Sequence, residues 1–263
     1  MNRRLLLAVV ALAVLAVTSG CLGIGTGDVP ADRIDSDPQS EYQWDANATT
    51  RITIQESADF RAVYEMNQSE IQLFRRDGFG GQNPLSVEAV RYRYPNGTVI
   101  TGSEIRERGG AVNQTRSVTT VQLPDDAPPN GGGKLAFTSE GSPKRFTLPT
   151  YVEGSYEVVL PPNRDVSFPV FGSVNPATDE RATVDGQVHL RWNEVTADTV
   201  AVQYYLQRDL YIFAGILAVL AVVGFGGLLH YRRQIESLKE KREEMGLGVE
   251  GDDGGNDGPP PGM

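Results

Sequence analysis

The chain has 263 residues and a formal net charge of −10, and between residues 22 and 209 it carries 26 acidic against 17 basic residues. This acidic balance argues against nucleic-acid binding, because phosphate contacts need clustered Lys and Arg. Cys21 is the only cysteine, which excludes an intrachain disulfide. The length leaves room for one or two modest domains.

Residues 1–20 have the layout of a signal peptide: a basic start, an apolar run and then small residues. The pair Arg3 and Arg4 resembles a twin-arginine export signal. The following residues 17–21, VTSGC, resemble a lipobox, the signal for cleavage before a cysteine that is then lipid-modified. We therefore predict an export signal at Arg3 and Arg4 and lipidation of Cys21. A retained N-terminal anchor and a free thiol are the alternatives.

Residues 21–43 are rich in Gly, Asp, Pro and Ser, a composition that predicts a flexible tether. From residue 44 to 207 the sequence predicts a β-rich domain. Residues 51–55, 90–94 and 188–192 alternate with the period of a strand, and Asn96-Gly97 is a hairpin signal. We expect further strands at 116–123, 134–138, 155–160 and 198–206. Residues 58–74 fit either one helix or two strands.

The fold class that follows is mainly β, with one or more extracytoplasmic β-sandwich-like domains and one C-terminal transmembrane helix. A boundary near residue 150 would divide the β-rich region into two units. Leu210–Leu229 is uncharged and long enough to cross a bilayer, so we predict a transmembrane helix over 208–231. A charged helix over 232–245 and a disordered tail over 246–263 complete the predicted organisation.

Orientation follows from the charges that flank the apolar stretch. Basic residues dominate directly after it, beginning with Arg232 and Arg233, while Arg208 and Asp209 cancel before it. By the positive-inside rule, we predict a single-pass cell-membrane protein with a cytoplasmic C-terminus and most of the chain outside. Four glycosylation motifs lie on the external side and none in the tail; their acceptors are Asn47, Asn67, Asn96 and Asn113.

The sequence offers little catalytic chemistry, and we predict no enzyme, no cofactor and no metal site. His189 is the only external histidine and lacks a motif that supplies a nucleophile, so we interpret it as an exposed strand residue. The acidic pairs Asp125-Asp126 and Asp179-Glu180 lack the spacing of a calcium loop and fit solvated turns. Residues 130–134, NGGGK, are interpreted as a turn and not a phosphate loop.

Several segments carry a family resemblance: 148–151 (LPTY), 154–162 (GSYEVVLPP), 171–172 (FG), 204–210 (YYLQRDL) and 233–235 (RQI). They resemble an uncharacterised family of haloarchaeal membrane-anchored lipoproteins, over most of the chain after about residue 45. The resemblance implies an acidic, salt-adapted cell surface and no activity. The expected function is therefore a cell-surface binding or envelope-interaction module. Its expected partners are membrane lipid and other envelope or membrane proteins.

Two other functions stay open. An extracytoplasmic sensor or an accessory subunit of a membrane complex would pass a signal into the tail. An unrecognised hydrolase would need a convergent external site.

Overall fold

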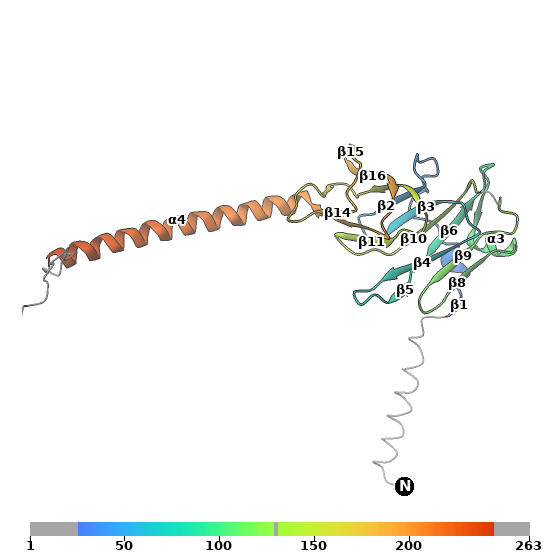
Figure 1. Ribbon diagram of the computed structural model, residues 1–263, viewed down its shortest axis with the longest axis horizontal. Helices are drawn as coiled ribbons and strands as arrows, with labels where there is room; N and C mark the ends of the chain where they lie inside the picture. The colour runs from blue at the N-terminus through green and yellow to red at the C-terminus, as the bar shows by residue number, and fades with distance from the viewer. Residues whose placement is uncertain (1–25, 129–130, 245–263) are drawn as a thin grey trace, which may run out of the picture. The chain divides into compact units, whose positions relative to one another are not determined.

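The computed structural model describes residues 26–128 and 131–244 (Figure 1). Internal contacts divide the chain into two units, Met1–Gln207 and Arg208–Met263. We call the described part of the first the β unit. The predicted signal peptide with Arg3 and Arg4, the lipidation residue Cys21 and the tail 246–263 lie outside the described residues.

The largest sheet has eight strands in the order β15-β16-β12-β2-β3-β10-β6-β7. All neighbours are antiparallel except β12 and β2, which run parallel. The strands are β2 (Thr50–Ile54), β3 (Phe60–Met66), β6 (Glu88–Arg93), β7 (Val99–Thr101), β10 (Gly133–Ser139), β12 (Gly154–Val159), β15 (Glu180–Val184) and β16 (Gln187–Val195).

Two smaller sheets lie against one face of the large sheet. The first has the order β1-β8-β9-β4-β5, the second β11-β17-β14, and a two-stranded ribbon pairs β13 with β18. Their strands are β1 (Gly27–Asp28), β4 (Glu70–Arg76), β5 (Gln82–Pro84), β8 (Ala111–Gln114), β9 (Thr119–Gln122), β11 (Arg145–Pro149), β13 (Arg164–Asp165), β14 (Ser173–Asn175), β17 (Thr199–Gln203) and β18 (Tyr205–Leu206).

The core fills the space between these layers. Alternating residues of the large sheet point inward, as the period of two requires, and pack on inward residues of β4, β11 and β17. Tyr64 and Phe137 stack with ring centroids 5.9 Å apart, and Phe60 meets Phe146 edge to face at 5.3 Å. Because Phe146 belongs to the second sheet, these rings join the two layers. The predicted sandwich-like, mainly β fold is confirmed.

The opposite face of the large sheet, which we call the outer face, is partly covered by residues 28–45, the N-terminal strap. The strap includes the short helix α2 (Ala31–Ile34). Its Val29 and Ile34 side chains are buried in the main core, and its Tyr42 side chain packs on the outer face with Val63, Ala89 and Ala136. A flexible tether was expected over 21–43, and the structure corrects this for the part that it describes. Basic side chains of the sheet donate to strap carbonyls: Arg91 to Ile34, Asp35 and Ser36, Arg61 to Ser40 and Glu41, and Lys134 to Trp44.

The helix α3 (Gly102–Glu107) begins at a capping box. The Thr101 hydroxyl accepts from the Glu104 backbone amide, and the Glu104 carboxylate accepts from the Thr101 amide at 2.7 Å. Gly102 packs against Ile34 of α2 so closely that a Cβ there would lie 2.7 Å from the Ile34 Cβ. Helix α3 therefore holds the strap as well as the edge of the sheet.

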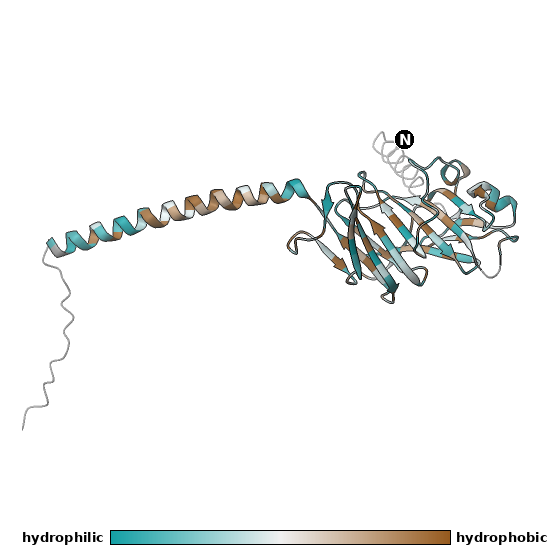
Figure 2. Cartoon of the chain, turned by 90° about the horizontal axis from the view of Figure 1, so that it is seen from above, coloured by the Kyte–Doolittle hydropathy of each residue, from teal (hydrophilic) through white to brown (hydrophobic). Residues whose placement is uncertain are grey.

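The helix α4 (Gln207–Glu244) begins directly after β18, so the expected span 208–231 and charged helix 232–245 form one helix as far as it is described. Its apolar stretch is flanked by polar residues (Figure 2). Among the described residues it is the one helix long and apolar enough to cross a membrane.

The strands predicted from alternation are present, and residues 58–74 hold two strands, β3 and most of β4, with no helix. The Asn96-Gly97 turn joins β6 to β7, with the Tyr94 amide donating to the Thr98 carbonyl at 2.8 Å. The optional boundary near residue 150 is not observed, because β12 pairs with β2 across it.

Candidate functional site

The predicted modification sites within the described residues are accessible. Asn47, Asn67, Asn96 and Asn113 all have exposed side chains. Asn96 also caps its own turn, since its Oδ1 accepts from the Thr98 amide at 2.9 Å. Exposure makes each asparagine reachable by a modifying enzyme, and whether any is glycosylated stays a prediction.

His189 was expected to be exposed, and the structure corrects this. It is buried on the outer face of β16, with Nδ1 2.9 Å from the Glu157 Oε1 on β12. Glu157 is only 4% exposed. The same Oε1 accepts from Arg191 Nε at 2.9 Å, and Oε2 accepts from Arg51 at 2.5 Å.

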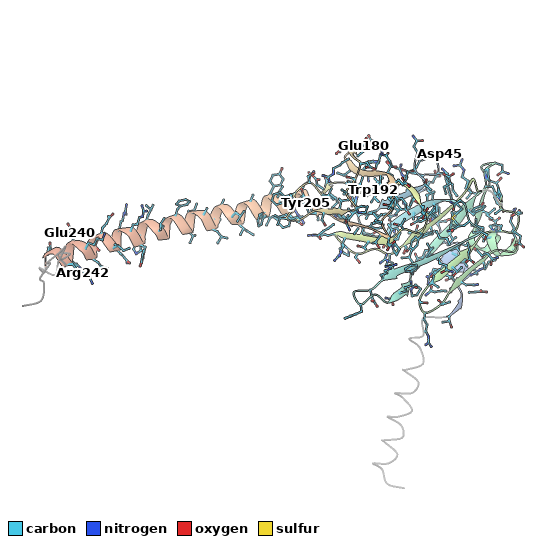
Figure 3. All side chains as sticks on the ribbon, in the orientation of Figure 1. Asp45, Glu180, Trp192, Tyr205, Glu240 and Arg242 are labelled. Carbon is cyan, nitrogen blue, oxygen red and sulfur yellow. The ribbon has the colours of Figure 1, made fainter. Side chains whose placement is uncertain are left out.

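The register explains this cluster. Arg51 on β2 lies opposite Glu157 on β12, and Glu157 lies opposite Arg191 on β16. Arg191 in turn lies opposite Glu180 on the edge strand β15, where Glu180 is labelled in Figure 3. The row alternates in charge, and opposite charges in facing positions stabilise a sheet. Burial raises the pKa of Glu157, but the hydrogen bonds from His189 and Arg191 and the charges of Arg51 and Arg191 outweigh it and hold the pKa below its usual value.

This cluster has the carboxylate–histidine half of a catalytic triad. A hydrolase also needs a nucleophile in hydrogen-bond contact with the imidazole. Among the described residues, no hydroxyl or thiol makes such a contact with His189. The row of charges instead joins four strands of the large sheet, which is a structural role.

The acidic pairs are engaged by neighbouring groups. Asp126 accepts from the Tyr94 hydroxyl at 2.6 Å and from Arg108 at 3.1 Å, and Asp179 accepts from the Asn193 amide at 2.7 Å. Within residues 26–128 and 131–244, no group of three or more His, Cys, Asp and Glu is placed to hold a metal ion. Lys134, in the expected glycine-rich turn, is the second residue of β10 and donates to the Trp44 carbonyl of the strap.

The feature most suited to binding is a groove between the end of β4 and the start of β11, which we call the arginine groove. Its cavity measures about 390 Å³. Three arginines and one carboxylate line it: Arg75 and Arg76 from β4, Arg145 from β11, and Asp77 from the turn after β4. Ser142, Thr147 and Thr199 add hydroxyl groups, and Gly78 and Gly141 bring backbone close to the cavity.

The three arginines differ in their partners. Arg75 is half-buried: it donates to the Glu140 carbonyl, and its guanidinium lies 5.7 Å from the centre of the Phe60 ring. Arg76 and Arg145 are exposed, and no described residue forms a hydrogen bond or ion pair with either guanidinium. Arg75 therefore belongs to the fold, whereas the other two leave their donors available.

The turn between β4 and β5 is held by hydrogen bonds to the Asp77 side chain. Asp77 Oδ1 accepts from the Phe79 amide at 2.9 Å and the Gly81 amide at 2.7 Å, which closes the β4–β5 hairpin. Gly80 has φ +85°, and a Cβ at Gly81 would lie 2.6 Å from the Asp77 carboxylate. The turn leaves the Phe79 side chain fully exposed, at 103% of its reference area.

This groove is not evident from the sequence. Arg75-Arg76 is visible as a pair, but Arg145 lies 69 positions later than Arg76, and only the packing of β4 beside β11 brings them together. The local signal that could have been used is the run 75–81, RRDGFGG, where an apolar aromatic stands inside a polar turn.

No curated protein matches the chain. A family model does match, over residues 46–250, and this range contains every strand from β2 onward and the whole of α4. The strap precedes the matched range. The chain belongs to the Family of unknown function (DUF5803).

Proposed function

We propose that this protein is a non-enzymatic binding module of the cell surface. In this proposal α4 holds it in the membrane, and the β unit binds anionic groups through the arginine groove. The observation that carries the proposal is the pair Arg76 and Arg145. Both are exposed and unpaired among the described residues, although the chain as a whole has a net charge of −10.

The chemistry of the groove limits the ligand class. Arginine presents a planar fork of donors that matches phosphate, sulfate or carboxylate oxygens in pairs. Hydroxyl and backbone groups around the cavity supply further neutral contacts. A cavity of about 390 Å³ is in the size range of small-ligand sites. An anionic head group or sugar acid in this cavity would be lined by both Arg76 and Arg145.

The test uses the full chain in non-ionic detergent micelles, with inorganic pyrophosphate as the probe and calorimetry as the readout. Arg76→Ala/Arg145→Ala removes two charge-assisted contacts, so we expect binding roughly tenfold weaker or more. Arg116→Ala/Arg181→Ala removes the same charge outside the groove and serves as the matched control. Equal binding by both double variants would contradict the proposal.

The placement of the module is also proposed. Basic residues after the apolar stretch support a cytoplasmic C-terminus, and the exposed asparagines of the four glycosylation motifs suit an external β unit. Cys21 would carry a lipid and membrane lipid would be one partner, with other envelope proteins as further candidates. Intact mass of the membrane-extracted protein, compared with Cys21→Ser, tests cleavage and lipidation. Protease digestion of intact cells tests orientation, since an external β unit would be cut.

The second candidate is a sensor or an accessory subunit of a membrane complex. One observation favours it: β18 pairs with β13, and α4 begins at the next residue, so no loop separates the β unit from the helix. Deleting residues 232–263 while preserving export separates the two candidates. Loss of a cellular phenotype with unchanged pyrophosphate binding would favour the sensor.

A further inference from the structure

The arginine groove lies at the end of the β unit from which the chain enters α4. Arg145, the first residue of β11, is registered opposite Gln203, the last residue of β17. Ser173 of β14 lies on the other side of Gln203. Figure 1 shows β11, β14 and the tip of the β4–β5 hairpin at the same end of the β unit, and Tyr205, labelled in Figure 3, lies there too.

The chain between this end and the apolar stretch is short. Leu210, the first residue of the uncharged run, comes seven residues after Gln203. Three extended steps of about 3.3 Å and four helical steps of about 1.5 Å give a contour of about 16 Å. If α4 spans a bilayer, this length keeps the groove near the headgroup layer, which is roughly 5–8 Å thick on each side.

Exposed apolar side chains flank the same end. Phe79 is fully exposed at the tip of the β4–β5 hairpin, next to Gly78 of the groove. Val170 is 65% exposed in the loop before β14. That loop is held by two contacts: Tyr205 Oη accepts from the Phe168 amide, and Gln203 Nε2 donates to the Phe171 carbonyl.

Single apolar residues are common on protein surfaces and need no explanation on their own. Here they share one end of the β unit with unpaired arginines and with the entry into an apolar helix. Amphipathic surfaces that bind membranes combine these features: apolar groups enter the acyl boundary while basic groups contact anionic lipid.

We propose that this end of the β unit docks on the bilayer that α4 crosses. Arg76 and Arg145 bind the phosphates of anionic lipid headgroups, and Phe79, supported by Val170, enters the interface. This inference rests on the proposed function and names the ligand class of its groove. A soluble anion or an acidic partner protein would be a different occupant, and the experiment separates these cases from a lipid.

The experiment uses the full chain in vesicles of phosphatidylglycerol or phosphatidylcholine whose acyl chains are brominated. Phe79→Trp reports on the hairpin tip, with the emission of native Trp44 and Trp192 subtracted using the unsubstituted protein. The control is Val99→Trp. The Val99 side chain is 44% exposed. Val99 is paired with Arg93, and Arg93 is paired with Lys134 near the start of β10. Glu140 and the groove lie at the other end of β10, so Val99 is remote from the groove.

In phosphatidylglycerol vesicles, we expect the tryptophan at 79 to be quenched by the brominated lipid and its emission to shift to the blue. Adding Arg76→Ala/Arg145→Ala should abolish both signals. The tryptophan at 99 should show neither. Equal quenching at 79 and 99 would overturn the inference. Quenching at 79 that survives loss of both arginines would overturn headgroup binding. Pyrophosphate binding in micelles, measured in parallel with Phe79→Ser, separates the two proposals.

If the arginines bind pyrophosphate but the tryptophan at 79 is not quenched, the groove has a soluble or protein ligand. The lipid inference then fails and the proposed function stands. If neither signal depends on the arginines, both proposals fail.

Discussion

The basic side chains of the β unit serve two different purposes, and the strap and the arginine groove show the contrast. Under the strap, Arg61, Arg91 and Lys134 each donate to backbone carbonyls of residues 34–44. In the groove, Arg76 and Arg145 have no described partner. The basic groups under the strap are therefore engaged by the fold, whereas the two groove arginines leave their donors available to a ligand. Substitution should therefore affect stability at the first place and binding at the second.

The largest expected loss of stability comes from removing the side chain that anchors the strap to the outer face. Tyr42 is buried against the outer face, and its hydroxyl donates to the Ala89 carbonyl at 2.7 Å and lies 3.0 Å from Thr138 Oγ1. Tyr42→Ala should lower the free energy of unfolding by about 4 kcal/mol, as loss of a buried aromatic does. Urea unfolding followed by tryptophan fluorescence measures it, because Trp44 packs 5.7 Å from Tyr42. Tyr42→Phe, which keeps the ring, should cost only about 1 kcal/mol.

The charge row on the outer face should give the next largest effect. Glu157→Gln leaves Arg51 and Arg191 without their shared carboxylate, and breaking a buried pair in this way costs about 3 kcal/mol. Arg191→Ala should cost less, because that side chain is 42% exposed. If the two variants unfold at the same urea concentration, the row does not act as described.

Acid should weaken the same row. The folded pKa of Glu157 lies below its ordinary value of 4.5, so its carboxylate contributes stability above the unfolded pKa. That contribution is lost as the pH falls through the folded pKa. We expect the free energy of unfolding to decline below about pH 4.5, and Glu157→Gln should flatten part of the decline. An identical pH profile for the variant would assign the acid sensitivity to other carboxylates, such as Asp35 and Asp165, whose pKa values are also lowered.

The smallest expected effect is the change in stability when the two unpaired groove arginines are replaced, compared with replacement of two strap-binding arginines. Arg76→Ala/Arg145→Ala should change the free energy of unfolding by less than about 0.5 kcal/mol, since neither side chain has a described partner to lose. Arg61→Ala/Arg91→Ala, with the same change of charge, should cost about 2 kcal/mol because several carbonyls lose their donors. Similar losses from both double variants would mean that the groove arginines also support the fold.

Sequence patterns within a few neighbouring residues predicted the strands and the helix that depend on short-range interactions. Alternation in residues 51–55, 90–94 and 188–192 located three strands of the large sheet, and the uncharged run located α4. The Thr101–Glu104 capping box was an equally local signal, and its helix was overlooked. The strap was misread because its composition is polar, with few apolar residues. What holds it is a set of donors that lie up to 90 positions away, as Lys134 does from Trp44.

The candidate site was less predictable for a related reason. His189 looked solvent-facing because its partner, Glu157, is 32 positions earlier and meets it only through strand pairing. The groove likewise unites two segments, and nothing near Arg145 in sequence indicates that Arg76 faces the same cavity. Charge composition alone suggested an acidic surface and concealed a local excess of positive charge.

The pairing of β1 with β8 fixes where the N-terminal segment joins the β unit. Gly27 is registered with Gln114, Gln114 with Thr119, and Thr119 with Leu73, two residues before Arg75. Cys21 precedes Gly27 by only six residues, which reach at most about 21 Å when fully extended. If Cys21 carries a lipid, this short segment therefore joins the lipid to the edge strand of the sheet that contains β4. A lipid at Cys21 and the helix α4 would then limit how far the β unit can move from the membrane from two different points of the chain.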